Sequence, residues 1–530
     1  MLYQSTRGNG IRITASEAIL RGLSEDGGLF VPESLPALSE RVIEELAKKP
    51  YSRRAAHIMG LFLSEFSEEE LIAISDESYR APAFRDPAIA PLHRLDGGTY
   101  FLELWHGPTC AFKDMALQVM PRLLTASQRL AQITTSRTKD ASIKRDIESS
   151  STSYKPLATG QFRSAERIRD VCILVATSGD TGKAALEGFR DVPGTKIMVF
   201  YPRDGVSDVQ KLQMTSQCGE NVSVFAVEGN FDDAQTGVKA VFSDEALRQE
   251  LGGRGIFLSS ANSINWGRLV PQVAYYFSAY CDLLDGRAIS LGDKINFCVP
   301  TGNFGNILAA YYAERMGLPV NRLICASNCN DVLTQFLETG VYNKDRPFFT
   351  TSSPSMDILV SNNLERLLFE ASGKDGGAVS ALMGALASTG RYEAPQGILA
   401  ETRRIFYGGR CSEADTMRTI AETFRSHGYL IDTHTAVAYK VLSDYRTDTG
   451  DDKPTVVVST ASPFKFCDSV LGALGWKGQG DGVELIEALA KATGIEPPPP
   501  IASLRGAQPR FTDSIKISDM KEAVMKFLVY

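Results

Sequence analysis

The chain has little of what marks several common classes of protein. It holds only 5 histidines in 530 residues, so we expect no histidine-rich metal site and no bound metal. It has no apolar run approaching the roughly 18 residues of a membrane-spanning helix and no apolar signal segment at its start. A net charge of −7 gives no basic surface for nucleic acid or anionic membranes, and the 9 cysteines are scattered without paired metal-ligand spacing. These absences predict a cytoplasmic protein with reduced cysteines that binds neither nucleic acid nor a membrane.

What the chain does contain is an alternation of short apolar segments with helical patterns. The segments 171–175, 196–200, 294–299, 323–326 and 455–458 are rich in apolar and β-branched residues, and turns or helical patterns follow several of them. Apolar strands that alternate with helices are typical of parallel sheets covered on both faces. The sequence therefore predicts an α/β fold.

Changes in this alternation of apolar segments and helical patterns indicate domain boundaries. Residues 1–90 alternate short helical patterns with turns and predict a helical N-terminal region. Residues 91–475 are predicted to form the α/β core, with a smaller sub-domain at about 105–245, and 476–530 a C-terminal extension. Residues 126–170 are rich in serine, threonine, lysine and arginine and lack sustained periodicity, so we expect a solvated or disordered insertion there.

One lysine stands where covalent chemistry is favoured. The segment His106-Gly-Pro-Thr-Cys-Ala-Phe-Lys-Asp114 runs into a helical pattern, so that a Gly-Pro turn delivers Lys113 to the start of a helix. The positive end of the helix and burial beside Phe112 would both lower the pKa of this amine, as Schiff-base formation requires. The alternative is a solvated lysine paired with Asp114, because most lysines are exposed.

A second motif, Ala176-Thr-Ser-Gly-Asp-Thr-Gly182, lies between a predicted strand and a predicted helix. Its glycines let the backbone approach a ligand, and the N–H groups and hydroxyls at the helix start would attract an anion. A nucleotide phosphate loop would need glycine at Thr177, and serine or threonine after Lys183, where the chain has alanine. A nucleotide is therefore excluded, whereas a carboxylate, a small phosphate ligand or a plain capped turn all remain open.

A third motif, Pro300-Thr-Gly-Asn-Phe-Gly-Asn306, repeats this geometry before the helical segment 306–315. A phosphate there would meet about half a positive charge from the helix dipole. A single glycine-rich turn is a weak signal, but two anion sites and a positioned lysine on one α/β chain are much less probable by chance. A cofactor that carries an aldehyde and a phosphate would use the lysine and one anion site, and leave the other for the substrate. This combination describes pyridoxal phosphate.

Taken in order, these motifs resemble the threonine synthases of fungi and proteobacteria. The resemblance covers nearly the whole chain except 126–170 and the end beyond about 480. It implies two parallel-sheet domains of the tryptophan-synthase-β type, which bind pyridoxal phosphate, after a helical N-terminal region. The other motifs that carry it are DGGLFVP (26–32), ANSINWGR (261–268), SPSMDILVSNNLERLLF (353–369), DTHTAVA (432–438) and STASPFKF (459–466).

The resemblance also implies roles for individual residues. Lys113 would bind the cofactor covalently and act as the catalytic base, and Thr460 would offer its hydroxyl to the pyridine nitrogen. Asp432 is expected to cap a helix rather than to act as an acid or base. The cofactor phosphate would be held by Gly302, Asn303, Phe304, Gly305 and Asn306. The substrate carboxylate or the cofactor ring oxygen would face Thr177, Ser178, Asp180 and Thr181, and the candidates for the substrate phosphate are Arg268 and His106.

The implied reaction converts O-phospho-L-homoserine and water into L-threonine and phosphate by γ-elimination and β-addition, the last step of threonine biosynthesis. One alternative is a threonine-synthase-like phospho-lyase, of the kind found in animals, that releases phosphate and 2-oxobutyrate. Another is a non-catalytic relative that keeps the fold, against which the intact Lys113, PTGNFGN and Thr460 argue. We expect a monomer or a homodimer.

Overall fold

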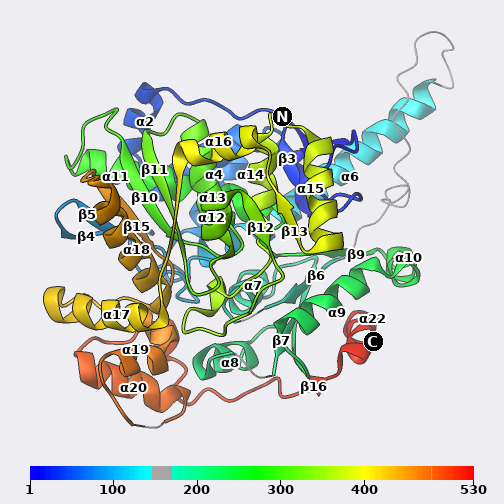
Figure 1. Cartoon of the computed structure of the whole chain (residues 1–530). Helices are drawn as coiled ribbons and strands as arrows, with labels where there is room; N and C mark the ends of the chain where they lie inside the picture. The colour runs from blue at the N-terminus through cyan, green and yellow to red at the C-terminus, as the bar shows by residue number, and fades with distance from the viewer. Residues whose placement is uncertain (146–169, 178, 204–205, 479, 530) are drawn as a thin grey trace.

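The computed structural model describes residues 1–145, 170–177, 179–203, 206–478 and 480–529. Two sheets, each packed between helices, dominate the arrangement in Figure 1. The α/β fold predicted from the apolar segments is confirmed, and each of those segments lies in a strand of one of the two sheets.

The larger sheet has six strands in the order β14-β11-β10-β15-β5-β4, and all neighbours are parallel except β4 and β5. Successive residues of β10 point to opposite faces of the sheet. Phe297 and Val299 pack on the face covered by α11 (Trp266–Asp285) and α12 (Gly305–Arg315). Cys298 packs on the face covered by α18 (Thr433–Thr449). Burial on both faces explains why its strands read as continuous apolar runs. The strands are β4 (Leu92–Asp96), β5 (Thr99–Glu103), β10 (Ile295–Pro300), β11 (Val320–Ser327), β14 (Phe406–Arg410) and β15 (Thr455–Ser459).

The smaller sheet has five strands, all parallel, in the order β16-β8-β7-β6-β9. Along β6, Ile173 packs on the side of α7 (Asp180–Phe189), and Leu174 on the opposite side with α9 (Phe231–Ser243). The strands are β6 (Asp170–Ala176), β7 (Thr195–Pro202), β8 (Val222–Val227), β9 (Ile256–Ser259) and β16 (Ser514–Ile515).

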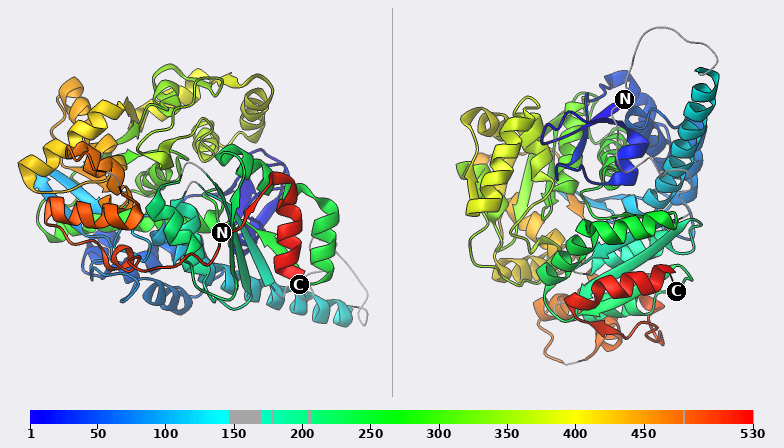
Figure 2. Two further views of the ribbon diagram at one scale, coloured as in Figure 1. Left: turned by 90° about the horizontal axis from the view of Figure 1, so that it is seen from below. Right: turned by 90° about the vertical axis from the view of Figure 1, so that its right-hand side faces the viewer.

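Two strands of this sheet come from outside the predicted range 105–245. One is β9, and the other is the two-residue β16, which the C-terminal extension adds beside β8. The extension ends in α22 (Met520–Val529), which lies against α9, as both views in Figure 2 show. A two-residue strand has no periodicity of its own, so sequence patterns cannot reveal it. The domain boundaries given above stay predictions.

The N-terminal region is helical as predicted, but it also contains a small antiparallel sheet of order β2-β1-β3. Helices α2 and α3 pack against α11 of the core, where the buried Arg54 contacts Asp282. The strands were missed because they are only three or four residues long. The elements are β1 (Leu2–Ser5), β2 (Arg12–Thr14), β3 (Phe30–Pro32), α1 (Ala15–Arg21), α2 (Glu40–Ala47), α3 (Tyr51–Phe62) and α4 (Glu68–Ser78).

The expected insertion at 126–170 needs correction in its first part. Helix α6 runs from Met120 to Arg145, so residues 126–145 are helical rather than a loop. The stretch from 122 to 145 contains neither glycine nor proline, and at its start Ala126 and Ser127 are buried as α6 packs on α1. The serines and threonines masked this helix because they weaken the apolar period. Residues 146–169 lie outside the described part of the chain.

The remaining elements connect these layers. No helix in the described residues is long and apolar enough to cross a membrane. They are α5 (Asp114–Leu117), α8 (Asp208–Thr215), α10 (Glu245–Gly253), α13 (Val332–Thr339), β12 (Val341–Asn343), η2 (Pro354–Met356), α14 (Leu364–Ala371), α15 (Gly376–Thr389), β13 (Arg391–Glu393), α16 (Gln396–Ile405), α17 (Glu413–His427), η3 (Pro463–Lys465), α19 (Cys467–Ala473), α20 (Gly482–Thr493), α21 (Pro499–Ala502) and η4 (Ile517–Asp519).

Candidate active site

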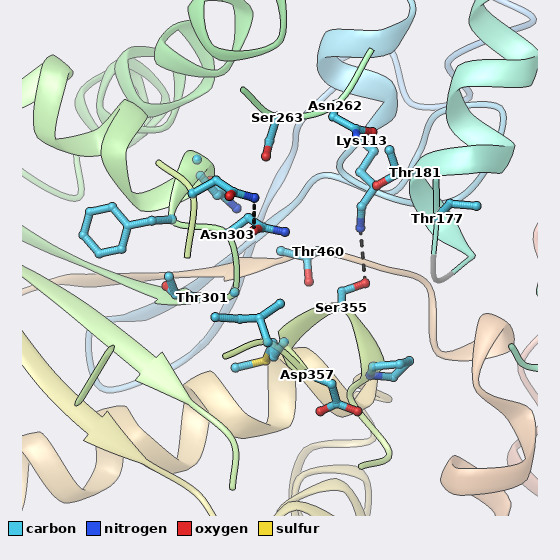
Figure 3. A pocket seen from close by; sticks show the side chains of 18 of the residues that line it. Lys113, Thr177, Thr181, Asn262, Ser263, Thr301, Asn303, Ser355, Asp357 and Thr460 are labelled. Atoms are coloured by element: carbon cyan, nitrogen blue, oxygen red, sulfur yellow. Dashed lines mark hydrogen bonds between the residues drawn. The ribbon is translucent and has the colours of Figure 1, made fainter. Parts of the chain in front are cut away.

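A cleft lies at the carboxyl ends of strands from both sheets, which is where α/β proteins bind ligands. It contains about 1030 Å³ of space not filled by protein atoms, part of it open to solvent. Residues that follow β6, β10 and β15 reach it, and Figure 3 shows their side chains converging. Of the residues predicted from sequence, those that line it are Lys113, Thr177, Thr181, Arg268, Gly302, Asn303, Phe304, Gly305, Asn306 and Thr460.

Lys113 lies at the residue before α5 and is buried, with 8% of its surface exposed. Its Nζ lies 3.3 Å from Ser355 Oγ, 3.4 Å from Asp180 Oδ2 and 4.8 Å from the centre of the Phe112 ring. Burial lowers the pKa of the Lys113 amine below its ordinary value, although the Asp180 carboxylate acts in the opposite direction. A larger fraction of the amine is therefore neutral at a given pH.

The alternative of a solvated lysine paired with Asp114 is wrong. Asp114 is fully buried and accepts hydrogen bonds from the N–H of Thr109 at 2.8 Å and from its hydroxyl at 2.7 Å. Burial raises the pKa of the Asp114 carboxyl to about 6. A Cβ at Gly107 would lie 2.5 Å from the Asp114 carboxylate, so this turn requires a glycine there. Asp114 thus fixes the turn that presents Lys113.

The segment from Pro300 to Asn306 forms the start of α12 and suits a phosphate group. The N–H groups of residues 303–306 form no hydrogen bond within the described residues, as expected of the first turn of a helix. The Asn306 Oδ1 accepts hydrogen bonds from the hydroxyls of Tyr275 and Tyr276, and its buried Nδ2 has no partner in the described residues. An unpaired buried donor beside free N–H groups fits an anionic oxygen.

Gly302 and Gly305 serve different purposes in this turn. A Cβ at Gly302 would lie 2.4 Å from the backbone oxygen of Ser355, so the glycine permits close packing of two loops. A Cβ at Gly305 would meet nothing nearer than Asn363 Nδ2 at 3.4 Å and Ser263 Cβ at 3.7 Å, both ordinary contacts. The space beside Gly305 belongs to the cleft and is left open for a ligand.

Substitution of the two glycines should therefore have different effects. Gly305→Val should weaken cofactor binding roughly 10- to 100-fold, the loss of about one charge-assisted hydrogen bond, without lowering the melting temperature of the cofactor-free protein. Gly302→Ala, the matched control, should lower that melting temperature because its methyl group overlaps a backbone oxygen. Titration with pyridoxal phosphate and thermal unfolding measure both effects, and equal cofactor affinity in Gly305→Val and the unaltered protein would contradict the prediction.

Thr460 and Arg268 complete the cleft. The Thr460 hydroxyl forms no hydrogen bond within the described residues, and in Figure 3 it lies between Lys113 and Asn303. The Arg268 guanidinium is buried and faces no carboxylate at ion-pair distance among the described residues. Burial lowers the pKa of Arg268 to about 10. A buried cation without its own counter-ion is suited to an anion that arrives with a ligand.

Two of the predicted residues, His106 and Asp180, do not line the cleft. The Nε2 of His106 lies 2.7 Å from Glu103 Oε2 and its ring stacks on Trp105, so its role toward the substrate phosphate stays a prediction. Asp180 lies just behind the cleft, where it contacts Lys113. Ser178 is outside the described residues.

Several cleft residues were missed by the sequence reasoning. The predicted cap is confirmed, since the Asp432 side chain accepts hydrogen bonds from the N–H groups of His434 and Thr435, but His434 also lines the cleft. Its Nε2 accepts the N–H of Ser355 at 3.2 Å, so Nδ1 carries the proton and donates to Asp432 Oδ2 at 2.8 Å. The motif DTHTAVA contained this histidine, but only the tertiary structure brings it against residues 353–358.

Models of three protein regions match the chain. They are threonine synthase N terminus over residues 2–79, pyridoxal-phosphate dependent enzyme over 74–461 and threonine synthase, C-terminal, over 435–524. Together these matches leave only Met1 and residues 525–530 of the chain uncovered.

Individual proteins agree with these matches. Threonine synthase from Pseudomonas aeruginosa is 38% identical over 89% of this chain and 90% of its own length. Threonine synthase-like 1 from Homo sapiens is also 38% identical, but this chain spans only 58% of its length. The crystal structure of threonine synthase from Brucella melitensis, with pyridoxal phosphate bound, is 35% identical and superimposes with a TM-score of 0.82 over 100% of both chains.

Proposed function

Since the chain belongs to the threonine synthase family of pyridoxal-phosphate-dependent enzymes, we propose that it converts O-phospho-L-homoserine and water into L-threonine and phosphate. The observation that supports this most strongly is the convergence of Lys113, the turn 302–306 and Thr460 on one cleft. These three are what an aldehyde, a phosphate and a ring nitrogen of one cofactor would need.

Pyridoxal phosphate, when bound, supplies an electron sink that stabilises carbanions of an amino-acid substrate. In our proposal Lys113 binds it covalently, the N–H groups at the start of α12 and Asn306 hold its phosphate, and the Thr460 hydroxyl faces its ring nitrogen. The unpaired Nδ2 of Asn306 and the open space beside Gly305 support this fit. Each group of the cofactor then meets a complementary group of the chain.

Lys113 is also the proposed base, because its amine lies at the cleft with a lowered pKa and would be free to carry protons when the substrate is bound. It would remove protons at Cα and Cβ, which allows phosphate to leave from Cγ, and return a proton at Cγ. Water would then add at Cβ, and Lys113 would return the last proton at Cα. Thr177 and Thr181, with Ser178, would orient the substrate carboxylate, and Arg268 would bind the phosphate that leaves.

The second function to consider is that of a phospho-lyase, which releases phosphate and 2-oxobutyrate. It shares all of these groups and differs only in the fate of the last intermediates. The greater coverage of Pseudomonas aeruginosa threonine synthase, 90% against 58% for the human threonine synthase-like protein, favours the first function. A non-catalytic relative is disfavoured because it would have no need for a buried lysine of lowered pKa.

Product analysis separates these functions. The purified protein is incubated with pyridoxal phosphate and O-phospho-L-homoserine, and amino acids, oxo acids and phosphate are quantified over time. We expect threonine and phosphate in equal amounts. Phosphate with 2-oxobutyrate in place of threonine would assign the phospho-lyase reaction, and no phosphate at all would reject the enzymatic proposal.

We also place the enzyme in the cytoplasm. All nine cysteines are free in the structure, as a reducing compartment favours. Whether it is a monomer or a homodimer stays a prediction.

A further inference from the structure

A second lysine, Lys465, is more deeply buried than Lys113. It ends η3, just after β15, and none of its surface is exposed. Its Nζ donates to the backbone oxygen of Thr109 at 2.8 Å and to Gln213 Oε1 at 2.9 Å, and lies 3.1 Å from Asp180 Oδ1. A buried ammonium is costly unless it is paired and fully hydrogen-bonded, and Lys465 meets both conditions.

The Asp180 carboxylate is shared between the two lysines, but unequally. Its Oδ1 contacts Lys465 at 3.1 Å and accepts a hydrogen bond from Gln210 at 2.8 Å. Among the described residues, its Oδ2 has only the longer contact of 3.4 Å with Lys113. Burial alone would raise the pKa of Asp180, but Lys465 and Lys113 lower it below its ordinary value. Lys465 is therefore the main counter-ion of the Asp180 carboxylate, whose ionised form the two lysines favour.

We propose that Lys465 is a positioning residue which, by acting as the counter-ion of Asp180, leaves the amine of Lys113 free to lose its proton. Without Lys465, Asp180 would have Lys113 as its only cationic partner and would hold that amine in its charged form. The charged groups that act on Lys113 are Asp180, Arg268 and Lys465, and His434 acts on Asp180. Of the two cations Arg268 and Lys465, Lys465 is the one that contacts Asp180 directly.

This inference rests on the proposed role of Lys113, but it can be tested on the full chain freed of cofactor. Trace labelling with acetic anhydride across a range of pH, followed by mass spectrometry of the peptide that contains Lys113, measures how much of its amine is neutral. In Lys465→Met we expect Lys113 to be labelled roughly tenfold more slowly below its midpoint, which corresponds to a midpoint about one pH unit higher. Asp180→Asn should have the opposite effect.

Two further variants separate charge from structure. Lys465→Gln keeps donors for Thr109 and Gln213 without the charge, and should slow labelling as Lys465→Met does. Lys183→Met, the matched control, removes a nearby cation that pairs with Glu187 and does not contact Asp180, and should leave the midpoint unchanged. If Lys465→Met does not fold, as judged by circular dichroism, the labelling of Lys113 in Lys465→Gln alone tests the proposal. Unchanged labelling in Lys465→Gln, or no acceleration in Asp180→Asn, would overturn the proposal.

The experiment does not depend on catalysis. If the unaltered protein forms no threonine but the variants shift the labelling of Lys113 as expected, the proposed function fails and this inference stands. If the unaltered protein forms threonine but Lys465→Gln leaves the labelling of Lys113 unshifted, this inference fails and the proposed function stands.

Discussion

Replacing Lys113 with alanine is expected to abolish the visible absorbance of the lysine-linked cofactor and to reduce turnover at least 10²- to 10⁴-fold, the range typical of a lost general base. The physical reason is that the variant loses both the covalent attachment and the proton carrier. Absorbance spectra and rates of phosphate release measure the two effects separately.

The attachment itself can be located directly. Reduction of the loaded protein with borohydride should fix the cofactor on the peptide that contains Lys113, and mass spectrometry identifies that peptide. Lys183→Met serves as the control, because Lys183 is also largely buried but pairs with Glu187 away from the cleft, and it should keep the absorbance. A normal spectrum and full activity in Lys113→Ala would remove the basis of the assignment.

Arg268→Met should have the second largest effect, a loss of kcat/KM of roughly 10²- to 10⁴-fold, with the cofactor spectrum retained. Two charge-assisted hydrogen bonds to a phosphate contribute about 1.5–3 kcal/mol each, and about 1.4 kcal/mol corresponds to a factor of ten. We expect so large a loss of kcat/KM because the buried Arg268 guanidinium has no carboxylate partner among the described residues and is therefore available to bind the substrate phosphate.

The control for the Arg268→Met variant is a second ligand rather than a second variant. Binding of L-homoserine, which lacks the phosphate, should be nearly the same in Arg268→Met and in the unaltered protein, while binding of O-phospho-L-homoserine weakens. Arg268→Lys should fall between the two because it keeps the charge but not the planar, forked donors. An equal loss for both ligands would show a structural effect, and a loss of cofactor affinity instead would assign Arg268 to the cofactor phosphate.

Local patterns were enough to predict most of the fold. The strands β6 and β10 are continuous apolar runs because both faces are buried, and each is followed by a motif whose glycines and polar residues mark a turn. Since parallel strands end at the same edge of a sheet, the approach of Thr460 to residues 300–306 follows from placing β15 beside β10. The convergence of the cofactor groups was therefore within reach of the sequence.

What could not be predicted depends on contacts between distant parts of the chain. Lys465 and Asp180 are 285 positions apart, and nothing near either residue indicates that one is the counter-ion of the other. The resemblance makes His106 a candidate for the substrate phosphate, but nothing near it in the sequence indicates that its side chain lies between Glu103 and Trp105. Spacing along the chain identifies the motif, whereas tertiary packing decides where each of its side chains points.

The most direct test of the central claim is to follow the oxygen of water. With O-phospho-L-homoserine in H₂¹⁸O, elimination at Cγ and hydration at Cβ should place the label in the hydroxyl of threonine and leave the newly released phosphate unlabelled when it is first formed. Mass spectrometry of both products gives the answer. Labelled phosphate together with homoserine would mean that the P–O bond is hydrolysed, and would contradict the proposed chemistry of Lys113 and its cofactor.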